Sequence, residues 1–338
     1  MLAIRKLQAA AGVTVTDTPA PEAIPHGWVQ LKVKMVGVCG TDLHIYNWDA
    51  WAQGRIKPPL TLGHELVGTV VGHGAGVDAA QFPLGGRYSA ECHVVNPLSQ
   101  ETRTGRAHLC PDTKILGVDM DGAMADYVLV PASNLWPISD DIPNHHAAIF
   151  DPLGNAMHTC QTVPLGGKRV LITGAGPIGL MCVAMAKALG AYEVIVSEVN
   201  PARRALAAEL GAVVTAPEDL TKTLAGRAPE VVLELSGHPA ALRQGLQVVA
   251  AGGDVVLLGI PAGEVSLPVA EQIIFRGLKL HGVVGRRMYD TWYQVEAFVR
   301  QNGAVVERLI SHQLPARDVQ QAFDLLCAGQ ANKIILEF

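Results

Sequence analysis

The segment 168–190 constrains the fold of this chain more than any other stretch. The apolar run Val170–Thr173 is followed at once by a glycine-rich turn and by the apolar run Ile178–Leu189, which stops at Gly190. This order predicts a buried strand, a tight turn and a helix. The uncharged stretch Val170–Ala186 is only 17 residues long and contains glycine and proline, so we do not expect it to span a membrane.

Short apolar runs alternate with helical stretches after this segment. Asn200 is a favoured helix cap, and Pro201 suits the first position of the helix that follows. The alternation predicts βαβ units that build a parallel sheet. We expect strands at Glu193–Ser197, Val231–Leu235, Asp254–Ile260 and Leu278–Val284, and helices at 201–210 and about 240–249.

The two ends of the chain have a different character. Glycine and proline interrupt the first 150 residues, in which Trp28–Met35 alternates apolar and polar residues as a half-buried strand does, and Leu66–Val71 is a second strand candidate. Near the C-terminus we expect helices at Thr291–Arg300 and Asp318–Leu326 and a strand at Ile334–Phe338. A length of 338 residues suits about two domains.

Composition excludes several classes of protein. Hydrophobic residues make up 49% of the chain and charged residues 17%, so the chain can bury a large core and is not disordered. The net charge of −5 lacks the basic excess of a nucleic-acid binder. No apolar run follows Arg5 and Lys6, and the six cysteines form no CxxC pair. We therefore expect a cytoplasmic protein with free thiols, no secretory signal, and neither nucleic acid nor membrane as a partner.

The glycine-rich turn has the spacing of a dinucleotide site. Gly174, Gly176 and Gly179 form a GxGxxG between the expected strand and helix. The first glycine permits the tight bend, the second lets the backbone approach a pyrophosphate, and the third lets the helix pack on the strand. Glu198 lies 19 residues after Gly179, where a carboxylate accepts from ribose hydroxyls and repels a 2′-phosphate, which favours NAD over NADP. The alternative is a structural turn with Glu198 on the surface.

A second group of chemically active residues lies in the N-terminal part. Cys39 and His64 are ligand types that suit zinc, and Glu65 or Asp151 could supply the third ligand of a catalytic site with one open position. The plain alternative makes Cys39 a small buried hydrophobe and His64 a hydrogen-bonded core residue. Residue types and spacing leave both interpretations open.

Longer motifs indicate which family the chain resembles. They are the run Cys39–His44 with its continuation to Trp51, Gly63–Glu65, Ala148–Ala156, the GxGxxG turn, and Gly285–Arg286 leading into Thr291–Tyr293. In this order they resemble the zinc-dependent medium-chain dehydrogenases over essentially the whole chain. The resemblance is closest to members that oxidise L-threonine with NAD, which implies L-threonine as the substrate. A zinc-dependent polyol or butanediol dehydrogenase and an NAD-binding module without catalytic activity are the alternatives.

The resemblance implies an α/β fold with two domains. Residues 1–151 and 291–338 would form a GroES-like, β-rich catalytic domain. Residues 152–290 would form a Rossmann domain with a doubly wound parallel sheet that binds NAD. The resemblance also implies a homotetramer.

The resemblance further assigns roles to individual residues. Cys39, His64 and Glu65 match the catalytic zinc ligands, Thr41 and His44 match a proton-relay pair, and Asp151 matches an acidic residue that ligates the metal directly or acts through a water. Strand-end residues in the NAD set can also be ordinary core, and Arg203 can be an ordinary surface arginine. The NAD contacts that the resemblance implies are Ile178, Glu198, Arg203, Leu258, Gly259, Ile260, Val283 and Val284.

The chain departs from the family pattern in one lobe. The family typically holds a second, structural zinc with four cysteines, whose positions here are Asn96, Ser99, Thr102 and Cys110. One thiolate cannot hold a structural zinc, so we predict one zinc ion per chain and a lobe that is mobile or held by packing and hydrogen bonds. Elsewhere, His145 and His146 lie in a connecting segment, and we expect them to be ordinary surface or hydrogen-bonded residues.

Overall fold

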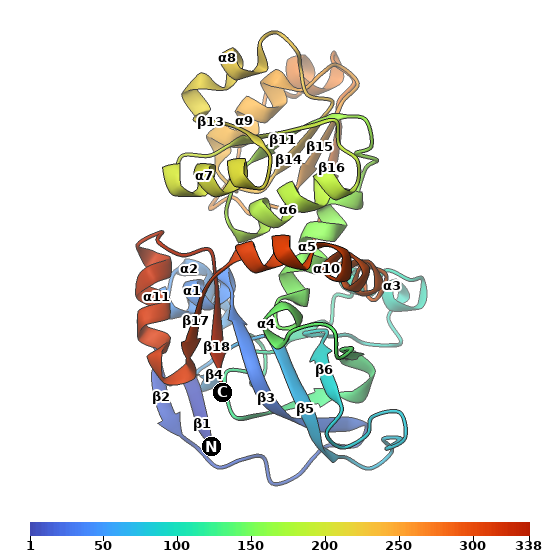
Figure 1. The fold of residues 1–338 in the computed structure, drawn as a ribbon, viewed down its shortest axis with the longest axis vertical. Coiled ribbons are helices and arrows are strands. Elements are labelled where there is room, and N and C mark those ends of the chain that lie inside the picture. Colours follow the sequence, from blue (N-terminus) through green and yellow to red (C-terminus); the bar gives the residue numbers. More distant parts are fainter. The chain divides into compact units, whose positions relative to one another are not determined.

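The computed structural model describes residues 1–338 as two compact units (Figure 1). Unit 1 contains two chain segments, Met1–Pro152 and Met288–Phe338, and unit 2 is the segment between them, Leu153–Arg287. Unit 1 therefore depends on contacts between residues that are far apart in the sequence. No helix of either unit combines the length and the apolar content that crossing a membrane requires.

Unit 2 is built on a six-stranded sheet. The strands are ordered β13-β12-β11-β14-β15-β16, and every neighbouring pair is parallel. The order runs outward from β11 in both directions, so the predicted doubly wound parallel sheet is confirmed. The strands are β11 (Arg169–Thr173), β12 (Glu193–Ser197), β13 (Val213–Thr215), β14 (Val231–Glu234), β15 (Asp254–Leu257) and β16 (Lys279–Gly282).

Helices cover both faces of this sheet. The chain passes into unit 2 within α5, and α6 and α7 then lie on one side of the sheet while α8 and α9 lie on the other (Figure 1). Asn200 caps α7 as predicted, because its Oδ1 accepts hydrogen bonds from the backbone N–H groups of Ala202 and Arg203. The helices are α5 (Phe150–Gln161), α6 (Pro177–Ala188), α7 (Pro201–Glu209), α8 (Leu220–Leu224) and α9 (Pro239–Val248).

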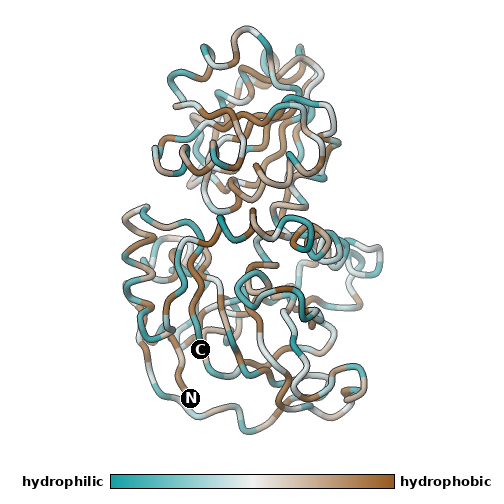
Figure 2. Tube along the Cα trace, in the orientation of Figure 1, coloured by the Kyte–Doolittle hydropathy of each residue, from teal (hydrophilic) through white to brown (hydrophobic).

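The strands of unit 2 are continuous apolar runs because both faces of the sheet are covered. All five residues of β11 are buried, and Leu171 packs in one core with Ile195 of β12 and Val232 of β14. Figure 2 shows these strands as hydrophobic segments of the trace. The C-terminal ends of the strands hold the turns in which polar and glycine residues collect.

Unit 1 contains three sheets. Its strands are β1 (Leu2–Lys6), β2 (Thr14–Asp17), β3 (Trp28–Val38), β4 (Leu60–Thr61), β5 (Glu65–His73), β6 (Arg87–Ala90), β7 (His93–Val94), β8 (Lys114–Ile115), β9 (Tyr127–Pro131), β10 (Leu135–Pro137), β17 (Ile310–Pro315) and β18 (Lys333–Glu337). The largest sheet has the order β10-β6-β5-β3-β18-β17 with β9 also paired to β3, and the smaller sheets are β2-β1-β4 and β7-β8.

The long strand β3 organises unit 1. It pairs antiparallel with β5, β9 and β18, and its first residues alternate between buried and more exposed positions as the sequence predicts. Val29, Leu31 and Val33 point into the core. Gly37 lies opposite Glu65 of β5, and Val38 lies opposite Ile334 of β18. Three strand ends therefore meet where β3 leaves the sheet.

Unit 1 also contains helices, and the periodicity of the sequence does not predict the short ones. Its helices are α1 (Gly40–Asn47), α2 (Ala50–Arg55), α3 (Gln100–Arg103), α4 (Asn144–Ala147), α10 (Asp290–Leu309) and α11 (Val319–Cys327). The first two are too short for an amphipathic period, and caps at Cys39 and Asp49 begin them. The helix expected at Thr291–Arg300 continues past a non-helical residue, Asn302, to the end of α10.

Candidate functional site

The ends of β3 and β5 place three candidate metal ligands together. Cys39 follows β3 and caps α1, and Glu65 is the first residue of β5, directly after His64. The antiparallel register puts Glu65 beside Gly37, two residues before Cys39. One ligand atom from each of Cys39, His64 and Glu65 lies within 4.8 Å of the others. Sheet pairing thus joins residues that are 25 positions apart in the sequence.

The backbone of Cys39 is held by a capping interaction. The Oδ2 atom of Asp42 accepts a hydrogen bond from the Cys39 N–H at 2.9 Å, which starts α1 at this residue. Asp42 is completely buried, and burial raises the pKa of its carboxyl group although nearby His64 and the Cys39 N–H oppose that shift. Asp42 is not among the predicted site residues, and its position three residues after Cys39 is the signal that could have identified it.

The cluster suits a cation. His64 is buried, and its Nδ1 atom has no hydrogen-bond partner, as expected of a ring nitrogen that is available to a metal. Burial disfavours the charged form of His64, but Cys39, Asp42 and Asp151 outweigh it and raise the pKa of this imidazole to about 10. These anionic neighbours therefore favour a positive charge at the position of His64. A thiolate, an imidazole and a carboxylate form a donor set that zinc prefers.

Glu65 is also part of a buried ion pair. The Nζ atom of Lys333 donates to both carboxylate oxygens of Glu65 at 2.8 Å and to the carbonyl of Val38 at 3.0 Å. Burial raises the pKa of Glu65, and the ammonium of Lys333 acts against that shift. Lys333 begins β18, 268 residues after Glu65, so no local motif indicates this partner.

Asp151 completes the acidic surroundings of the cluster. It is buried in the first turn of α5, and its negative charge acts on His64, Glu65 and Lys333. The structure therefore brings Asp151 to the same cluster as Cys39, His64 and Glu65. Among Cys39, His64 and Glu65, only Glu65 is in an ion pair with an ammonium.

The two expected proton-relay residues lie on α1. Thr41 and His44 are three positions apart and so lie on the same side of the helix. The Sγ atom of Cys39 lies 3.8 Å from the Oγ1 atom of Thr41, which places this hydroxyl beside the cluster. The side chain of His44 is 59% exposed, and its Nδ1 atom pairs with Asp49. The pair therefore extends from the cluster to solvent.

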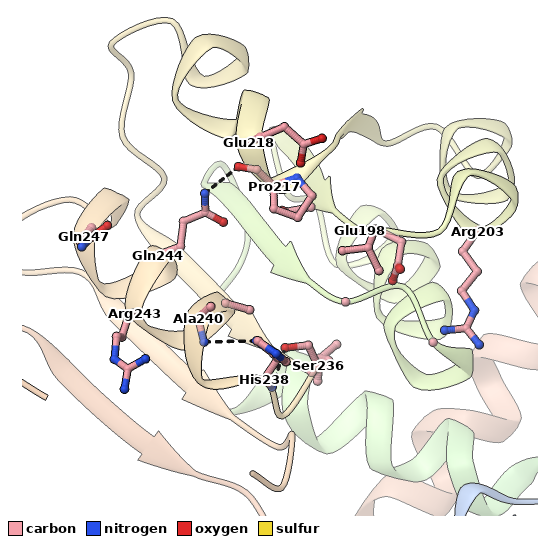
Figure 3. A pocket seen from close by; sticks show the side chains of 16 residues that line it. Glu198, Arg203, Pro217, Glu218, Ser236, His238, Ala240, Arg243, Gln244 and Gln247 are labelled. Carbon is pink, nitrogen blue, oxygen red and sulfur yellow. Dashed lines mark hydrogen bonds between the residues drawn. The ribbon is translucent and has the colours of Figure 1, made fainter. Parts of the chain in front are cut away.

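A separate cavity lies in unit 2, at the C-terminal ends of β11, β12 and β14. Its volume is about 880 Å³. Its lining, part of which Figure 3 labels, includes Gly174, Gly176, Glu198, Arg203, Pro217, Ser236, His238, Arg243, Gln244 and Gln247. The glycine-rich turn and the expected ribose-binding carboxylate are therefore brought to one cavity within the same unit.

The glycine-rich turn leaves room for a ligand. Gly174 has a φ of +90°, which favours glycine, and a side chain there would collide with Ser236. A Cβ atom at Gly176 would meet nothing within 4 Å, so this residue borders open space at the N-terminus of α6. A Cβ atom at Gly179 would lie 2.2 Å from the carbonyl oxygen of Gly174, which shows how closely the helix packs on the turn.

The polar residues of the cavity are held in place by backbone groups. Glu198 accepts hydrogen bonds from the N–H groups of Ala175 at 2.5 Å and Asn200 at 2.8 Å. The Nε atom of Arg203 is buried and has no hydrogen-bond partner. Glu198, a hydrogen-bond acceptor, and Arg203, an unsatisfied donor, thus line the cavity beside the N-terminus of α6. This arrangement fits a dinucleotide, which has hydroxyl and phosphate groups.

Two family models match this chain. The alcohol dehydrogenase GroES-like domain matches residues 25–140, and the zinc-binding dehydrogenase model matches residues 177–301. An L-threonine 3-dehydrogenase from Symbiobacterium thermophilum is 44% identical and covers 99% of this chain and 97% of its own. Another, from Chromobacterium violaceum, is 43% identical and covers 100% of both chains. The chain belongs to the zinc-dependent alcohol dehydrogenase family.

Solved structures share the fold of this dehydrogenase. A short chain alcohol dehydrogenase from Escherichia coli CFT073, complexed with the cofactor NADH, has a TM-score of 0.90 at 26% identity and covers 100% of this chain and 99% of its own. A 2R,3R-butanediol dehydrogenase from Bacillus subtilis has a TM-score of 0.89 at 25% identity, with the same coverage. The predicted fold class, a GroES-like domain with a Rossmann-like parallel sheet, is confirmed.

Other predicted cofactor contacts of the dehydrogenase do not line the cavity at Glu198. Leu258, Gly259 and Ile260 follow β15, and Val283 and Val284 follow β16, so they lie along the same C-terminal edge of the sheet. Ile178 is in the first turn of α6. Ile260 is 89% exposed and Val284 is 54% exposed, so neither is an ordinary core residue.

Several polar residues of the cavity were not predicted. Ser236 and His238 follow β14, and Arg243 and Gln244 lie on α9. Gln244 donates to the carbonyl oxygen of Pro217 at 2.7 Å, which joins two walls of the cavity (Figure 3). The rule that ligands bind at the carboxyl ends of parallel strands could have indicated the residues after β14, as it did those after β11.

The lobe that lacks three of the four family cysteines contains a network of hydrogen bonds. Ser99 Oγ donates to Thr102 Oγ1 at 3.1 Å and accepts from the Thr102 N–H at 3.2 Å. Asn96 donates from its side chain to Asp112 at 3.0 Å. Burial disfavours the charged form of Cys110, but hydrogen bonds from Ser99 and from the backbone of Asn96 contribute to a lowered pKa of this thiol. The four positions therefore lie close together and interact through polar groups.

Proposed function

We propose that this dehydrogenase oxidises L-threonine to L-2-amino-3-oxobutanoate and reduces NAD to NADH. The observation that carries the proposal is the convergence of Cys39, His64 and Glu65, in a chain that is 44% identical to a relative named for this activity. Oxidation of a secondary alcohol needs a group that acidifies the hydroxyl, a route for the proton and a hydride acceptor. Each of these needs has candidate residues here.

Cys39 and His64 would hold a zinc ion, with Glu65 or Asp151 as the further carboxylate. When bound, zinc supplies the Lewis acidity that lowers the pKa of the substrate hydroxyl. Asp42 fixes the backbone of Cys39, and Lys333 fixes the carboxylate of Glu65. These contacts restrict the donors to one arrangement, so little reorganisation accompanies binding.

Thr41 and His44 would carry the hydroxyl proton to solvent. The Thr41 hydroxyl can accept one proton while it donates its own, and it lies beside the cluster. The exposed imidazole of His44 can receive that proton and release it to water, since histidine changes charge near neutral pH. Asp49 orients the His44 ring through its Nδ1 atom.

The cavity in unit 2 would bind the adenosine and pyrophosphate part of NAD. The N-terminus of α6 would face the pyrophosphate, and Glu198 would accept hydrogen bonds from the ribose hydroxyls. When bound, NAD would supply the acceptor for the hydride of the carbinol carbon, while Thr41 and His44 would take the hydroxyl proton, so the substrate would lose two hydrogens in total. We further propose that Ile178 contacts NAD and that the nicotinamide lies against Leu258, Gly259, Ile260, Val283 and Val284.

A panel of alcohols tests this proposal directly. NADH formation is measured by absorbance with L-threonine, 2,3-butanediol and sorbitol, each with NAD and with NADP. We expect L-threonine with NAD to have the highest kcat/KM. Cys39→Ala should lose both zinc and activity, whereas Cys327→Ala, which alters an exposed thiol, should retain both. Full turnover after exhaustive chelation would exclude the zinc mechanism.

One observation favours a second candidate substrate class. A butanediol dehydrogenase has the same fold over the whole chain, and its substrate is also a secondary alcohol. Its 25% identity is well below the 44% of the threonine dehydrogenase. A higher kcat/KM for 2,3-butanediol than for L-threonine in the same panel would reverse this order.

We also propose that the chain binds one zinc ion tightly. The polar network around Ser99, Thr102 and Cys110 supports a lobe that is held by hydrogen bonds in place of a second metal. Elemental analysis of desalted protein should give one zinc per chain, and Cys110→Ser should leave that value unchanged. Two zinc ions retained after desalting would contradict the proposal.

Assembly and location complete the proposed function. A homotetramer is supported by the unpaired edge strand β16 and by exposed apolar side chains close to it in the sequence, including Ile274 and Phe275. A cytoplasmic location is supported by six free cysteines, which suit a reducing compartment.

A further inference from the structure

Two adjacent histidines of unit 1 converge on one carboxylate. His145 and His146 lie on α4, and Glu307 lies on α10. The Nε2 atoms of the two rings lie 2.7 Å and 2.9 Å from the same oxygen, Glu307 Oε2. The ring centroids are 4.5 Å apart and the rings are nearly perpendicular. Both histidines are thus hydrogen-bonded, one of the two states expected of them, and the sequence did not indicate that they share Glu307 as a partner.

The arrangement is held by the packing of α4 against α10. His146 is buried, and its ring lies over Gly303, where a Cβ atom would be 3.8 Å from the ring carbon Cε1. Gly303 and Glu307 are four residues apart and so lie on one face of α10. The His146 imidazole therefore packs on the face of α10 that carries Glu307. His145, which is 20% exposed, then closes the group from the outside.

Unit 1 contains a second group of three residues whose side chains could bind a metal, but their carboxylate already has other hydrogen-bond partners. Glu91, Cys92 and His93 also have ligand atoms within 4.8 Å of one another. However, the Glu91 carboxylate is completely buried and accepts from the indole N–H of Trp292 at 2.9 Å and from the His93 N–H at 3.0 Å. A metal would have to displace these donors. By contrast, Glu307 is 54% exposed, and its partners His145 and His146 would themselves be ligands of the ion.

We propose that His145, His146 and Glu307 bind a first-row divalent cation, such as Ni²⁺ or Zn²⁺, at a site distinct from Cys39, His64 and Glu65. Two imidazoles and one carboxylate are a donor set for these ions, and water would fill the remaining positions. Metal–nitrogen bonds of about 2.0–2.1 Å place tetrahedral ligand atoms about 3.3 Å apart. Glu307 needs to move outward by only about 0.5 Å, which an exposed side chain does at low cost.

The protonation of the site also suits a metal. Burial lowers the pKa of His146 more than Glu307 raises it, so this imidazole is available in its neutral form. Burial disfavours the charged form of Glu307, but its bonds to His145 and His146 hold its pKa below the usual value. Neutral imidazole and ionised carboxylate are the forms that coordinate metals. To bind the ion, each ring would carry its proton on Nδ1, so that Nε2, which here contacts Glu307 Oε2, can coordinate.

The ion would connect the two chain segments of unit 1. α4 belongs to the segment Met1–Pro152 and α10 to the segment Met288–Phe338, which unit 2 separates in the sequence. A cation bound to both helices closes a loop of more than 150 residues and stabilises the folded unit. The partly exposed site exchanges its ion, so desalting would empty it.

Nickel titration of the zinc-loaded, desalted protein tests the proposal. Equilibrium dialysis should show one Ni²⁺ bound per chain with no release of zinc. His145→Ala and Glu307→Gln should each weaken that binding at least tenfold. His26→Ala and Glu22→Gln, which alter an exposed histidine and an exposed carboxylate of the same unit, should leave it unchanged.

A second readout guards against misfolded variants and against binding at the other cluster. Ni²⁺ should raise the Tm of the wild type in a concentration-dependent way and should not raise the Tm of Glu307→Gln. Cys39→Ala should still bind one Ni²⁺, because its altered ligand belongs to the other site. The absence of saturable Ni²⁺ binding, or equal affinity in wild type, His145→Ala and Glu307→Gln, would overturn the proposal. Neither result bears on the oxidation of L-threonine.

Discussion

Glu65 and Glu198 are both buried carboxylates, and their different partners give them different chemistry. Glu65 contacts the ammonium of Lys333 through both oxygens, whereas the bonds found for Glu198 come from the backbone N–H groups of Ala175 and Asn200. Each Glu198 oxygen accepts one hydrogen bond there and keeps a further lone pair. Glu198 can therefore accept hydrogen bonds from the hydroxyl groups of a ligand. Glu65, in contrast, is already paired with the positive charge of Lys333.

Replacement of Glu198 tests how the cofactor is selected. Glu198→Ala removes a charged acceptor, so we expect the Kd for NAD to rise about tenfold or more. It should also reduce the preference for NAD over NADP, because the repulsion of the 2′-phosphate is lost. Fluorescence titration with both cofactors measures these effects, and Glu264→Ala is the matched control on an exposed carboxylate. An unchanged NAD preference would show that another group reads the ribose.

His44 determines how the proposed reaction responds to pH. The relay needs an imidazole that accepts the proton passed on by Thr41, so the rate should depend on this ring. His44→Ala should reduce kcat, change its pH profile and leave the zinc content unchanged. A pH series of kcat and kcat/KM measures the effect. His312→Ala, which alters a histidine bonded only to Ser311, should keep the wild-type profile.

At the scale of elements, the candidate metal site depends on three strand ends. β3 ends just before Cys39, β5 begins at Glu65, and β18 begins at Lys333. Because both neighbours run antiparallel to β3, their first residues lie opposite its last ones. The register therefore positions the site: a Cβ atom at Gly37 would lie only 2.1 Å from Glu65 Oε2.

Loss of Lys333 should destabilise unit 1. Lys333→Met leaves the buried carboxylate of Glu65 without its cation, which should lower the free energy of unfolding by about 3–5 kcal/mol. Urea unfolding of zinc-depleted protein measures this change, and Lys34→Met on the exposed side of β3 is the control. The double variant Lys333→Met, Glu65→Leu should recover most of the stability, since no unpaired charge remains. Equal stability of Lys333→Met and Lys34→Met would show that the pair contributes nothing.

At the scale of the whole molecule, unit 2 has one exposed edge that bears on the proposed assembly. β16 is the last strand of the parallel sheet, and Leu280 on it is 37% exposed. Ile274 and Phe275, which precede it, are 65% and 79% exposed. An unpaired strand beside large apolar side chains is typical of a surface that another copy of the chain covers.

A charge at this edge should therefore reduce the size of the assembly. Phe275→Asp places a carboxylate where apolar contact is expected, and light scattering after size exclusion should give a lower mass than that of the wild type. Tyr192→Asp, at another exposed aromatic residue of unit 2, should keep the wild-type mass. A wild type that is already monomeric, or a Phe275→Asp variant of unchanged mass, would contradict assembly through this edge.

Local patterns determined much of this protein. The strand β12 lies at the predicted residues, and α6 and α7 lie within two residues of theirs, because a turn, a cap or a proline marks each boundary. The GxGxxG turn and Glu198 were assigned to one site and line one cavity. These features depend on residues close in the sequence, where backbone geometry restricts the choices.

Only the tertiary structure decided which distant side chains meet. The pairing of Lys333 with Glu65 and of Glu307 with His145 and His146 joins residues more than 150 positions apart. No local period encodes such pairs, since they arise from strand register and helix packing. The motif around Cys39 and His64 indicated a zinc site through its residue types, but the balance of charge around that site follows from burial, which only the folded chain defines.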